Sequence, residues 1–372
     1  MRTLGVEEEM LLVDVHDGRP RSVSGQLLVR AARRHADEAV DGVQGAVEGE
    51  FQQQQIETHT PPTDDLDTLR QEVRRWRAEA GAAAKGTGSS VAALATSPLS
   101  VRPVPVVTRR YAWLQERYQL TAREHLVCGC HVHVSVAGDE EGVGVLDRIG
   151  VWLPALLALS ANSPYWNGQD SGFASYRSQA LARFPSWGPT ARFGSADAYH
   201  RLVRDMVLST VVLDEGMVYF VARLAQHYPT VEIRAADVCF TVEEAVVVAA
   251  LCRGLVETAA QDWALDRPAP DVATTMLRLA TWQAGREGLE GRLLDWRTGL
   301  PVSCWTVLES LLDHVGPALE AAGDLAVVQD GLARVREEGN GAVRQRTMLA
   351  RTGRLADVVA EAVRATALDD VL

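Results

Sequence analysis

The sequence lacks the features of several common protein classes. Cysteine is scarce, with five among 372 residues, and an odd number of scattered thiols does not predict a disulfide-stabilised scaffold. No stretch approaches the roughly 18 uncharged apolar residues of a membrane-spanning helix. Three consecutive glutamates stand near the N-terminus, where a signal peptide would have an apolar run. We therefore expect reduced thiols, a cytoplasmic location and no membrane partner.

The common nucleotide-binding motifs and a basic charge balance are also missing. There is no Walker A sequence and no Gly-x-Gly-x-x-Gly motif after a strand, which disfavours the widespread nucleotide folds. The chain has 37 basic and 49 acidic residues, a formal net charge of −12, so a nucleic-acid partner is not expected. What is present is ordinary globular composition, 47% hydrophobic and 23% charged, enough for a substantial core.

Short strand-like segments and helical patterns are mixed in the first two thirds, and helical patterns dominate from about residue 271. We expect strands at 4–13, 48–58, 91–96, 127–136, 217–221 and 230–235, and helices at 25–35, 64–84, 148–161 and 241–256. Because clean strand–helix–strand repetition is missing, this order predicts an α+β fold with a mostly antiparallel sheet and a helical C-terminal third. Without a repeat or clear linker, we expect one domain over 1–372.

The strand at the N-terminus carries carboxylates where a buried strand should carry valines. Side chains alternate between the two faces of a strand, so Glu7 and Glu9 point one way and Glu8 points the other. Two carboxylates within about 7 Å on one face repel each other and cost stability unless a cation lies between them. The alternative is a solvated edge strand.

Three further strand-like segments carry ionisable residues on one face. Glu57 precedes a turn, His131 and His133 share a face, and Glu232 shares a face with Arg234. Taken singly, these residues are also compatible with a surface glutamate, a packed histidine pair and a surface ion pair. Taken together, several carboxylates with an imidazole suit a hard cation, Mg²⁺ or Mn²⁺, better than zinc. A carboxylate cage beside an arginine fits metal-chelated ATP.

These segments resemble the glutamate–cysteine ligase type 2 (carboxylate–amine ligase) family of the glutamine-synthetase-like superfamily. The matching pieces follow the family order over roughly the first two thirds of the chain: GVEEE at 5–9, QIETHTP at 55–61, CGCHVHVSV at 128–136, ANSPYWNGQDSGFASYRSQ at 161–179 and VEIRAAD at 231–237. At 94–99 and 279–281 the chain departs from the family pattern, so the substrates stay open.

The resemblance implies a fold and a set of site residues. The expected fold is a glutamine-synthetase-like curved sheet with helices on its outer face and with ATP and divalent metals on its concave face. Glu50 would reach this face only through a bulge, because it lies seven residues before Glu57 in the predicted strand. The implied metal ligands are Glu7, Glu9, Glu57, Glu232 and Glu50; the implied nucleotide-site residues are His131 and Arg234, which would be catalytic, and Arg286; the implied substrate contacts are Tyr176, Arg177 and His133.

The expected function is ATP-dependent joining of a carboxylate to an amine through an acyl phosphate. Glutamate with cysteine, or a related pair of small molecules, would be the substrates, although the same chemistry on a specialised metabolite stays open. A homodimer is plausible from the family. Two other classes are alternatives: a metal-dependent hydrolase that uses His131 and His133, and a relative that binds nucleotide without catalysis.

Overall fold

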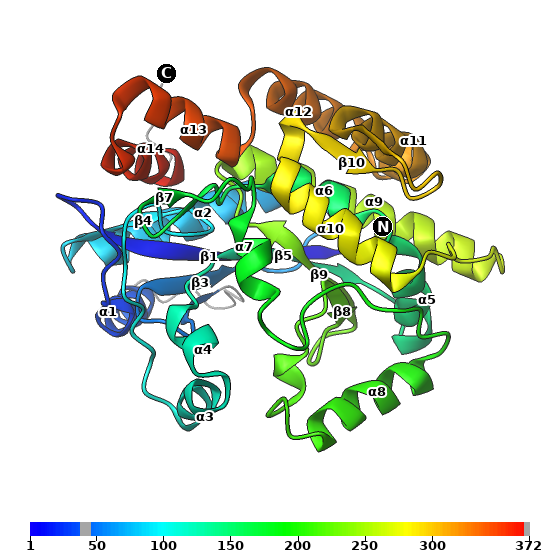
Figure 1. Ribbon diagram of the computed structural model, residues 1–372, viewed down its shortest axis with the longest axis horizontal. Coiled ribbons are helices and arrows are strands. Elements are labelled where there is room, and N and C mark those ends of the chain that lie inside the picture. The colour runs from blue at the N-terminus through cyan, green and yellow to red at the C-terminus, as the bar shows by residue number, and fades with distance from the viewer. Residues whose placement is uncertain (38–45, 368–372) are drawn as a thin grey trace.

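The computed structural model of the protein describes residues 1–37 and 46–367, which form an α+β fold around one large antiparallel sheet (Figure 1). The sheet has the strand order β2-β3-β1-β5-β9-β8, and β4 pairs with the C-terminal end of β1, from Leu11 to Asp14. Its strands are β1 Leu4–Asp14, β2 Ala46–Gly49, β3 Gln55–His59, β4 Ser89–Ala92, β5 Gly129–Ser135, β8 Ala222–Leu224 and β9 Thr230–Asp237. The expected α+β class and antiparallel sheet are confirmed.

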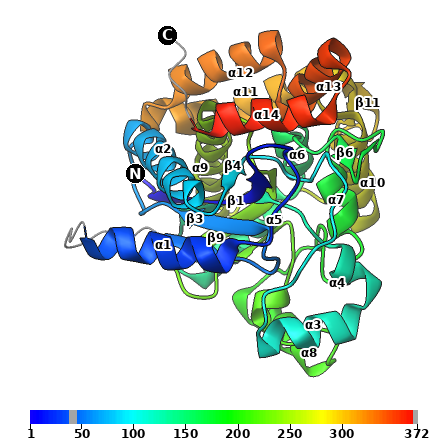
Figure 2. The same ribbon diagram turned by 90° about the vertical axis from the view of Figure 1, so that its left-hand side faces the viewer.

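Helices cover one face of this sheet and only border the other. In Figure 1 and Figure 2, α2, α9 and the C-terminal helices lie on one side, while α3, α4 and α8 lie on the other. The first helices are α1 Ser24–Asp37, α2 Leu66–Lys85, α3 Arg109–Tyr118, α4 Leu120–Glu124, α7 Tyr176–Leu181, α8 Ala196–Leu208 and α9 Val242–Ala264. Helix α9 is capped at its N-terminus by Thr241, whose hydroxyl accepts from the backbone N–H of Glu244 at 3.2 Å.

The C-terminal third is helical, as expected, with one small hairpin inserted. Its helices are α10 Thr274–Glu287, α11 Cys304–Ala322, α12 Leu325–Glu338, α13 Gly341–Thr352 and α14 Leu355–Ala367, and its hairpin is β10 Arg292–Leu294 with β11 Pro301–Ser303. Two short strands, β6 Tyr165–Trp166 and β7 Gln169–Asp170, form another small hairpin before α7.

The strand predicted at 48–58 is wrong, because this segment reverses direction. Strands β2 and β3 pair antiparallel, with Glu48 opposite Glu57. The glutamines between them bond to other parts of the chain: the Gln53 side chain donates to the Pro105 carbonyl and the Gln54 side chain to the Arg102 carbonyl. Glu50 therefore reaches the face of Glu57 through this reversal and not through a bulge in one strand.

Two further predicted elements are also wrong. The strand expected at 217–221 lies at β8, Ala222–Leu224, after a short 3₁₀ turn. The helix expected at 148–161 is two helices, α5 Asp139–Ile149 and α6 Leu153–Ser160; Pro154 in the first turn of α6 fits a new helix start. Across the described residues, no single helix is long and apolar enough to cross a membrane, and α5 with α6, bent by 72°, meets that test only as a pair.

A buried ion pair joins β1 to α2 on the helix-covered face. Arg77 donates to both carboxylate oxygens of Glu8, at 2.8 and 2.6 Å, and also to the Cys239 carbonyl at 2.8 Å. The side chains of Arg77 and Glu8 are 0% and 3% exposed. A charge enclosed to this degree is stable only with its partner, so the pair fixes which face of β1 turns toward the helices. The edge-strand alternative for β1 is wrong.

We predict that Arg77→Met lowers the free energy of unfolding by about 3–5 kcal/mol, because it leaves the Glu8 carboxylate buried without a partner. Urea denaturation followed by circular dichroism measures the change. The double variant Glu8→Met/Arg77→Met should recover much of the loss, since it buries no charge. Arg75→Met, on the exposed side of the same helix, is the control. Equal losses in the two Arg variants would contradict the prediction.

Candidate active site

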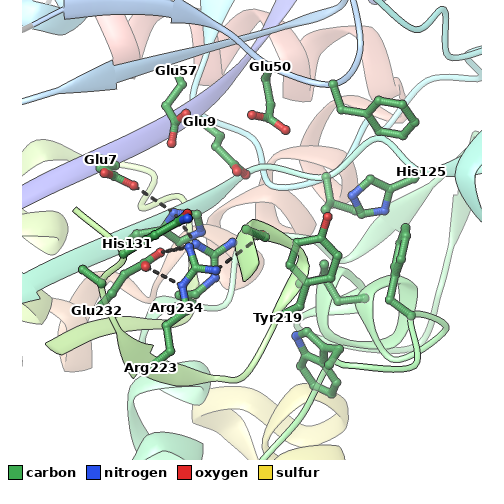
Figure 3. A pocket seen from close by; sticks show the side chains of 18 of the residues that line it. Glu7, Glu9, Glu50, Glu57, His125, His131, Tyr219, Arg223, Glu232 and Arg234 are labelled. Carbon is green, nitrogen blue, oxygen red and sulfur yellow. Dashed lines mark hydrogen bonds and ion pairs between the residues drawn. The ribbon is translucent and has the colours of Figure 1, made fainter. Parts of the chain in front are cut away.

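The open face of the sheet holds a cavity of about 320 Å³. Acidic, histidine and arginine side chains from β1, β3, β5 and β9 form one part of its wall, and aromatic side chains form another. In Figure 3, the carboxylates of Glu7, Glu9, Glu57 and Glu50 point toward the space beside His131 and Arg234. The cavity therefore gathers nine of the eleven predicted site residues: these six together with Glu232, His133 and Arg177.

Glu7 is surrounded by three histidines. Its carboxylate lies 3.3 Å from His131 Nδ1, 3.1 Å from His133 Nε2 and 3.3 Å from His59 Nδ1. Although burial opposes the charged form, hydrogen bonds to these imidazoles hold the pKa of Glu7 far below its usual range. Glu7 is therefore ionised at neutral pH and holds the three rings around one point.

Glu232 lies between two arginines. Arg223 donates to both of its oxygens, at 2.6 and 3.2 Å, and Arg234 bonds to Oε1. Burial opposes ionisation, but the two guanidinium groups hold the pKa of Glu232 well below its usual range. Arg234 also lies 3.4 Å from Nδ1 of His131, and burial followed by this cation lowers the pKa of His131. His131 is therefore neutral, as a metal ligand must be.

The other carboxylates repel one another. Burial and then the charges of Glu7, Glu50 and Glu9 raise the pKa of Glu57 well above its usual range. Burial and then the charge of Glu9 raise the pKa of Glu50 to about 7. Glu9 accepts a hydrogen bond of 2.6 Å from the Gly129 backbone. A divalent cation would relieve this repulsion and keep every carboxylate ionised.

The spacing of the donor atoms also fits metal ions. Oxygen and nitrogen atoms within 4.8 Å of one another occur in three groups: Glu7, His131 and Glu232; Glu7, Glu57 and His59; and Glu9, Glu57 and His131. In the described part of the chain, the buried Nε2 atom of His131 has no hydrogen-bond partner. Because oxygen donors predominate, the site suits Mg²⁺ or Mn²⁺.

Arg177 is held beside the carboxylates by a buried polar network. Its guanidinium lies 3.7 Å from Asp237, which accepts hydrogen bonds from the Asn162 backbone and from the hydroxyls of Ser163 and Ser175 at 2.7–2.9 Å. A Cβ atom at Gly129 would lie 2.3 Å from Arg177, so only glycine permits this approach. Asp237 thus ties the 161–179 segment and Arg177 to the end of β9.

Two predicted site residues lie elsewhere. Tyr176 packs against Trp166 and Phe173, with ring centroids 5.2 and 5.9 Å apart, and is not among the residues that line the cavity. Arg286 lies over the ring of Phe173, also outside the lining. The geometry gives no support to a substrate contact by Tyr176 or a phosphate contact by Arg286.

Two lining residues that contact the predicted carboxylates, His59 beside Glu7 and Arg223 beside Glu232, escaped the sequence analysis. His59 follows Glu57 by two positions in β3, so the alternation of side chains was a signal that could have found it. Arg223 had no such signal, because its strand was predicted several residues too early; the register places it opposite Glu232.

Comparisons with known proteins identify the family of the chain. The family model described as glutamate–cysteine ligase family 2 matches residues 3–362. The chain belongs to this family. A candidate glutamate–cysteine ligase 2-1 of Streptomyces avermitilis is 52% identical over 98% of this chain and 99% of its own length. A candidate glutamate–cysteine ligase 2 of Streptomyces coelicolor is 51% identical, with the same two shares.

Solved structures show the same fold at low sequence identity. A glutamate–cysteine ligase of Francisella tularensis, in complex with AMP, matches with a TM-score of 0.70 and 13% identity over 99% of this chain and 89% of its own. A bifunctional glutathione synthetase of Pasteurella multocida matches with a TM-score of 0.66 and 15% identity over 98% of this chain and 52% of its own. With the family match, the chain is a ligase of the carboxylate–amine class.

For this ligase we predict that Glu57→Gln weakens the binding of Mn²⁺ by about 10- to 100-fold, because it removes a charged oxygen from two of the three donor groups. Titration of Mn²⁺ followed by electron paramagnetic resonance measures the free ion. The matched control is Glu48→Gln, which changes the exposed glutamate opposite Glu57 on β2. Equal affinities for the two variants would contradict a metal site at Glu57.

We also predict that Asp237→Asn lowers the free energy of unfolding by about 1–3 kcal/mol, because an amide cannot accept from all three buried donors. Urea denaturation measures this change. Asp170→Asn alters an exposed acid of the same 161–179 segment and is the control, with an expected change below about 0.5 kcal/mol. A fully stable Asp237→Asn protein would show that the network does not hold the segment.

Proposed function

We propose that this ligase uses ATP with Mg²⁺ or Mn²⁺ to convert a carboxylate into an acyl phosphate, which an amine then attacks. One observation carries the proposal. Carboxylates from β1, β3 and β9 converge with Arg234 in a single cavity, and bound divalent cations would relieve their mutual repulsion while leaving them ionised. Membership of a ligase family supports the same chemistry, and the similar ligase of Francisella tularensis has AMP bound.

The proposed chemistry divides into two balanced steps. A carboxylate oxygen of the acid attacks the γ-phosphorus of ATP, the bond to the β-phosphate breaks, and ADP leaves. The amine then attacks the acyl carbon, inorganic phosphate leaves, and the amine loses a proton. Bound divalent ions supply screening between the negatively charged acid and the triphosphate.

The residues of this chain would act by positioning and by fixed charge. Glu7, Glu9, Glu57 and Glu232 would hold the ions with His131, and Glu50 would join them from the β2–β3 reversal. Burial opposes the charged form of Arg234, but the charge of Glu232 and their hydrogen bond raise its pKa above the usual range. Its permanent cation can therefore stabilise charge that develops on the transferred phosphoryl group.

No cysteine is needed in this chemistry. All five cysteines are buried, and burial followed by the charge of Glu9 raises the pKa of Cys128, a neighbour of the cavity lining, well above its usual range. A buried neutral thiol is a poor nucleophile, so a covalent enzyme intermediate on cysteine is disfavoured. The oxygen-rich donor set likewise disfavours a zinc hydrolase built on His131 and His133.

We predict that the protein forms ADP from Mg-ATP only when an acid and an amine are both present, with glutamate and cysteine as the first pair to test. Release of ADP and phosphate, in a matrix of acids and amines, measures the reaction. Glu9→Gln should lower turnover at least about tenfold while preserving the fold. Glu361→Gln, an exposed glutamate of α14, is the control. Normal turnover by Glu9→Gln would remove Glu9 from the site.

A further inference from the structure

The cavity has an aromatic end that the proposed chemistry does not use. We call it the aromatic chamber and define it by the lining residues Phe51, Tyr111, His125, Phe184, Trp187 and Tyr219. Figure 3 shows His125 and Tyr219 lying together, away from Glu7 and Glu232. None of the six side chains is acidic, and none carries a permanent positive charge.

The rings of the chamber support one another and are therefore set before any ligand enters. Phe184 meets His125 edge-on at 4.8 Å and Tyr219 at 5.6 Å, and Phe51 lies 5.0 Å from Tyr111. Phe184 also packs edge-on against Tyr118 at 5.3 Å, and Tyr118 is outside the lining. Packed rings that border a cavity, instead of filling it, form a preorganised surface for an apolar group.

The polar atoms of the chamber are neutral and few. Burial lowers the pKa of His125 to about 3, so its ring carries no charge, and its Nδ1 atom lacks a hydrogen-bond partner among the described residues. Burial raises the pKa of Tyr219 to about 12, which keeps its hydroxyl protonated. Arg110 also lines the cavity near Tyr111 and Tyr219, but its guanidinium is paired with Asp214. An ionic side chain would therefore lose its hydration here without gaining an unpaired partner of opposite charge. An apolar or aromatic body with one polar atom fits better.

Charged groups stand at the border between the chamber and the carboxylates. The charge of Glu50 acts on both Tyr111 and Tyr219, and the charges of Arg183 and Arg177 act on His125. Arg177 and His131 both approach Gly129, where a Cβ atom would lie 2.3 Å from Arg177 Nη2 and 3.0 Å from His131 Nε2. A carboxylate at this border would meet a guanidinium on one side and the proposed metal site on the other.

The polar side chains of Gln226, His227 and Tyr228 line another part of the cavity. There the β8–β9 turn, Ala225–Tyr228, separates the cavity from a second hollow of about 340 Å³, and both hollows share Arg223 and this turn. Tyr228 is 66% exposed and lies edge-on to His133 at 6.5 Å. A triphosphate reaching the carboxylates from this side would leave the aromatic chamber free for the acid.

We propose that the aromatic chamber binds the body of the carboxylate substrate, and that this substrate is an acid with an apolar or aromatic body whose carboxylate lies at Arg177 beside the metal site. The inference rests on the proposed function and narrows its substrate class. Glutamate, whose second carboxylate and ammonium would face neutral rings, is then a poor substrate.

Hydroxylamine can replace the unknown amine in the test, because it converts any acyl phosphate into a hydroxamate and phosphate. The acids are 3-phenylpropionate, hexanoate and glutamate, each with Mg-ATP and the whole protein. We expect kcat/KM for 3-phenylpropionate to exceed that for glutamate at least about tenfold. Preference for glutamate would overturn the proposal and leave the ligase function intact. Absence of hydroxamate with every acid would overturn the proposal together with the proposed function.

Variants locate the acid within the cavity. Tyr219→Ala should raise the KM for 3-phenylpropionate at least about tenfold and leave the KM for ATP within about twofold, and Tyr219→Phe should restore the KM for the acid. Trp282→Ala removes an exposed ring outside the cavity lining and should change neither constant. A raised KM for ATP in Tyr219→Ala would assign the chamber to the nucleotide base and overturn the proposal.

A binding measurement separates the chamber from the chemistry. Calorimetry should detect 3-phenylpropionate binding to the wild-type protein and to Trp282→Ala, and at least about tenfold weaker binding to Tyr219→Ala. Thermal unfolding of each variant shows whether it is folded, and Tyr219→Phe must bind the acid if the ring is what matters. Equal binding by Tyr219→Ala and the wild type would overturn the proposal whatever the outcome of the hydroxamate assay.

Discussion

Strand β1 carries three consecutive carboxylates, and the rest of the structure satisfies each face of the strand in a different way. Glu8 points to the helices and is neutralised by Arg77 inside the core. Glu7 and Glu9 point to the open face, where Glu7 meets histidines and Glu9 meets a backbone N–H. A shift of one residue in the register of β1 would exchange its two faces. The Glu8–Arg77 pair therefore also fixes the face to which Glu7 and Glu9 point.

The charges on the open face are only partly balanced by protein groups. Glu232 is paired with two arginines, but Glu57 and Glu50 are crowded by other carboxylates. Such crowding lowers the free energy of unfolding of a chain without bound ions, and the binding of cations would raise it again. In the proposed function, the same crowding makes the free protein less stable and increases its affinity for a metal-chelated anion. Such a compromise is common at functional sites.

Much of this site could be predicted from the sequence because alternation along a strand is a local rule. Side chains along a strand repeat their direction every two residues. This repeat predicts the shared face of Glu7 and Glu9, the opposite face of Glu8, and the pairing of Glu232 with Arg234. Residues brought by chain reversals could not be predicted in the same way. Glu50 reaches the cavity through the β2–β3 turn, and Arg223 through the register of β8 on β9.

The aromatic chamber shows where local pattern carries least information. Its rings come from segments far apart in the chain, around Phe51, Tyr111, Phe184 and Tyr219, and singly each is an ordinary core residue. The proposed substrate surface differs from an ordinary filled core only because these rings lie together beside Arg177. The carboxylates of the proposed metal site lie on paired strands, whose register permits little variation, whereas the chamber is built by loops and short helices on the rim. The chemistry is therefore fixed by the sheet, while the choice of acid is left to segments that can change without disturbing it.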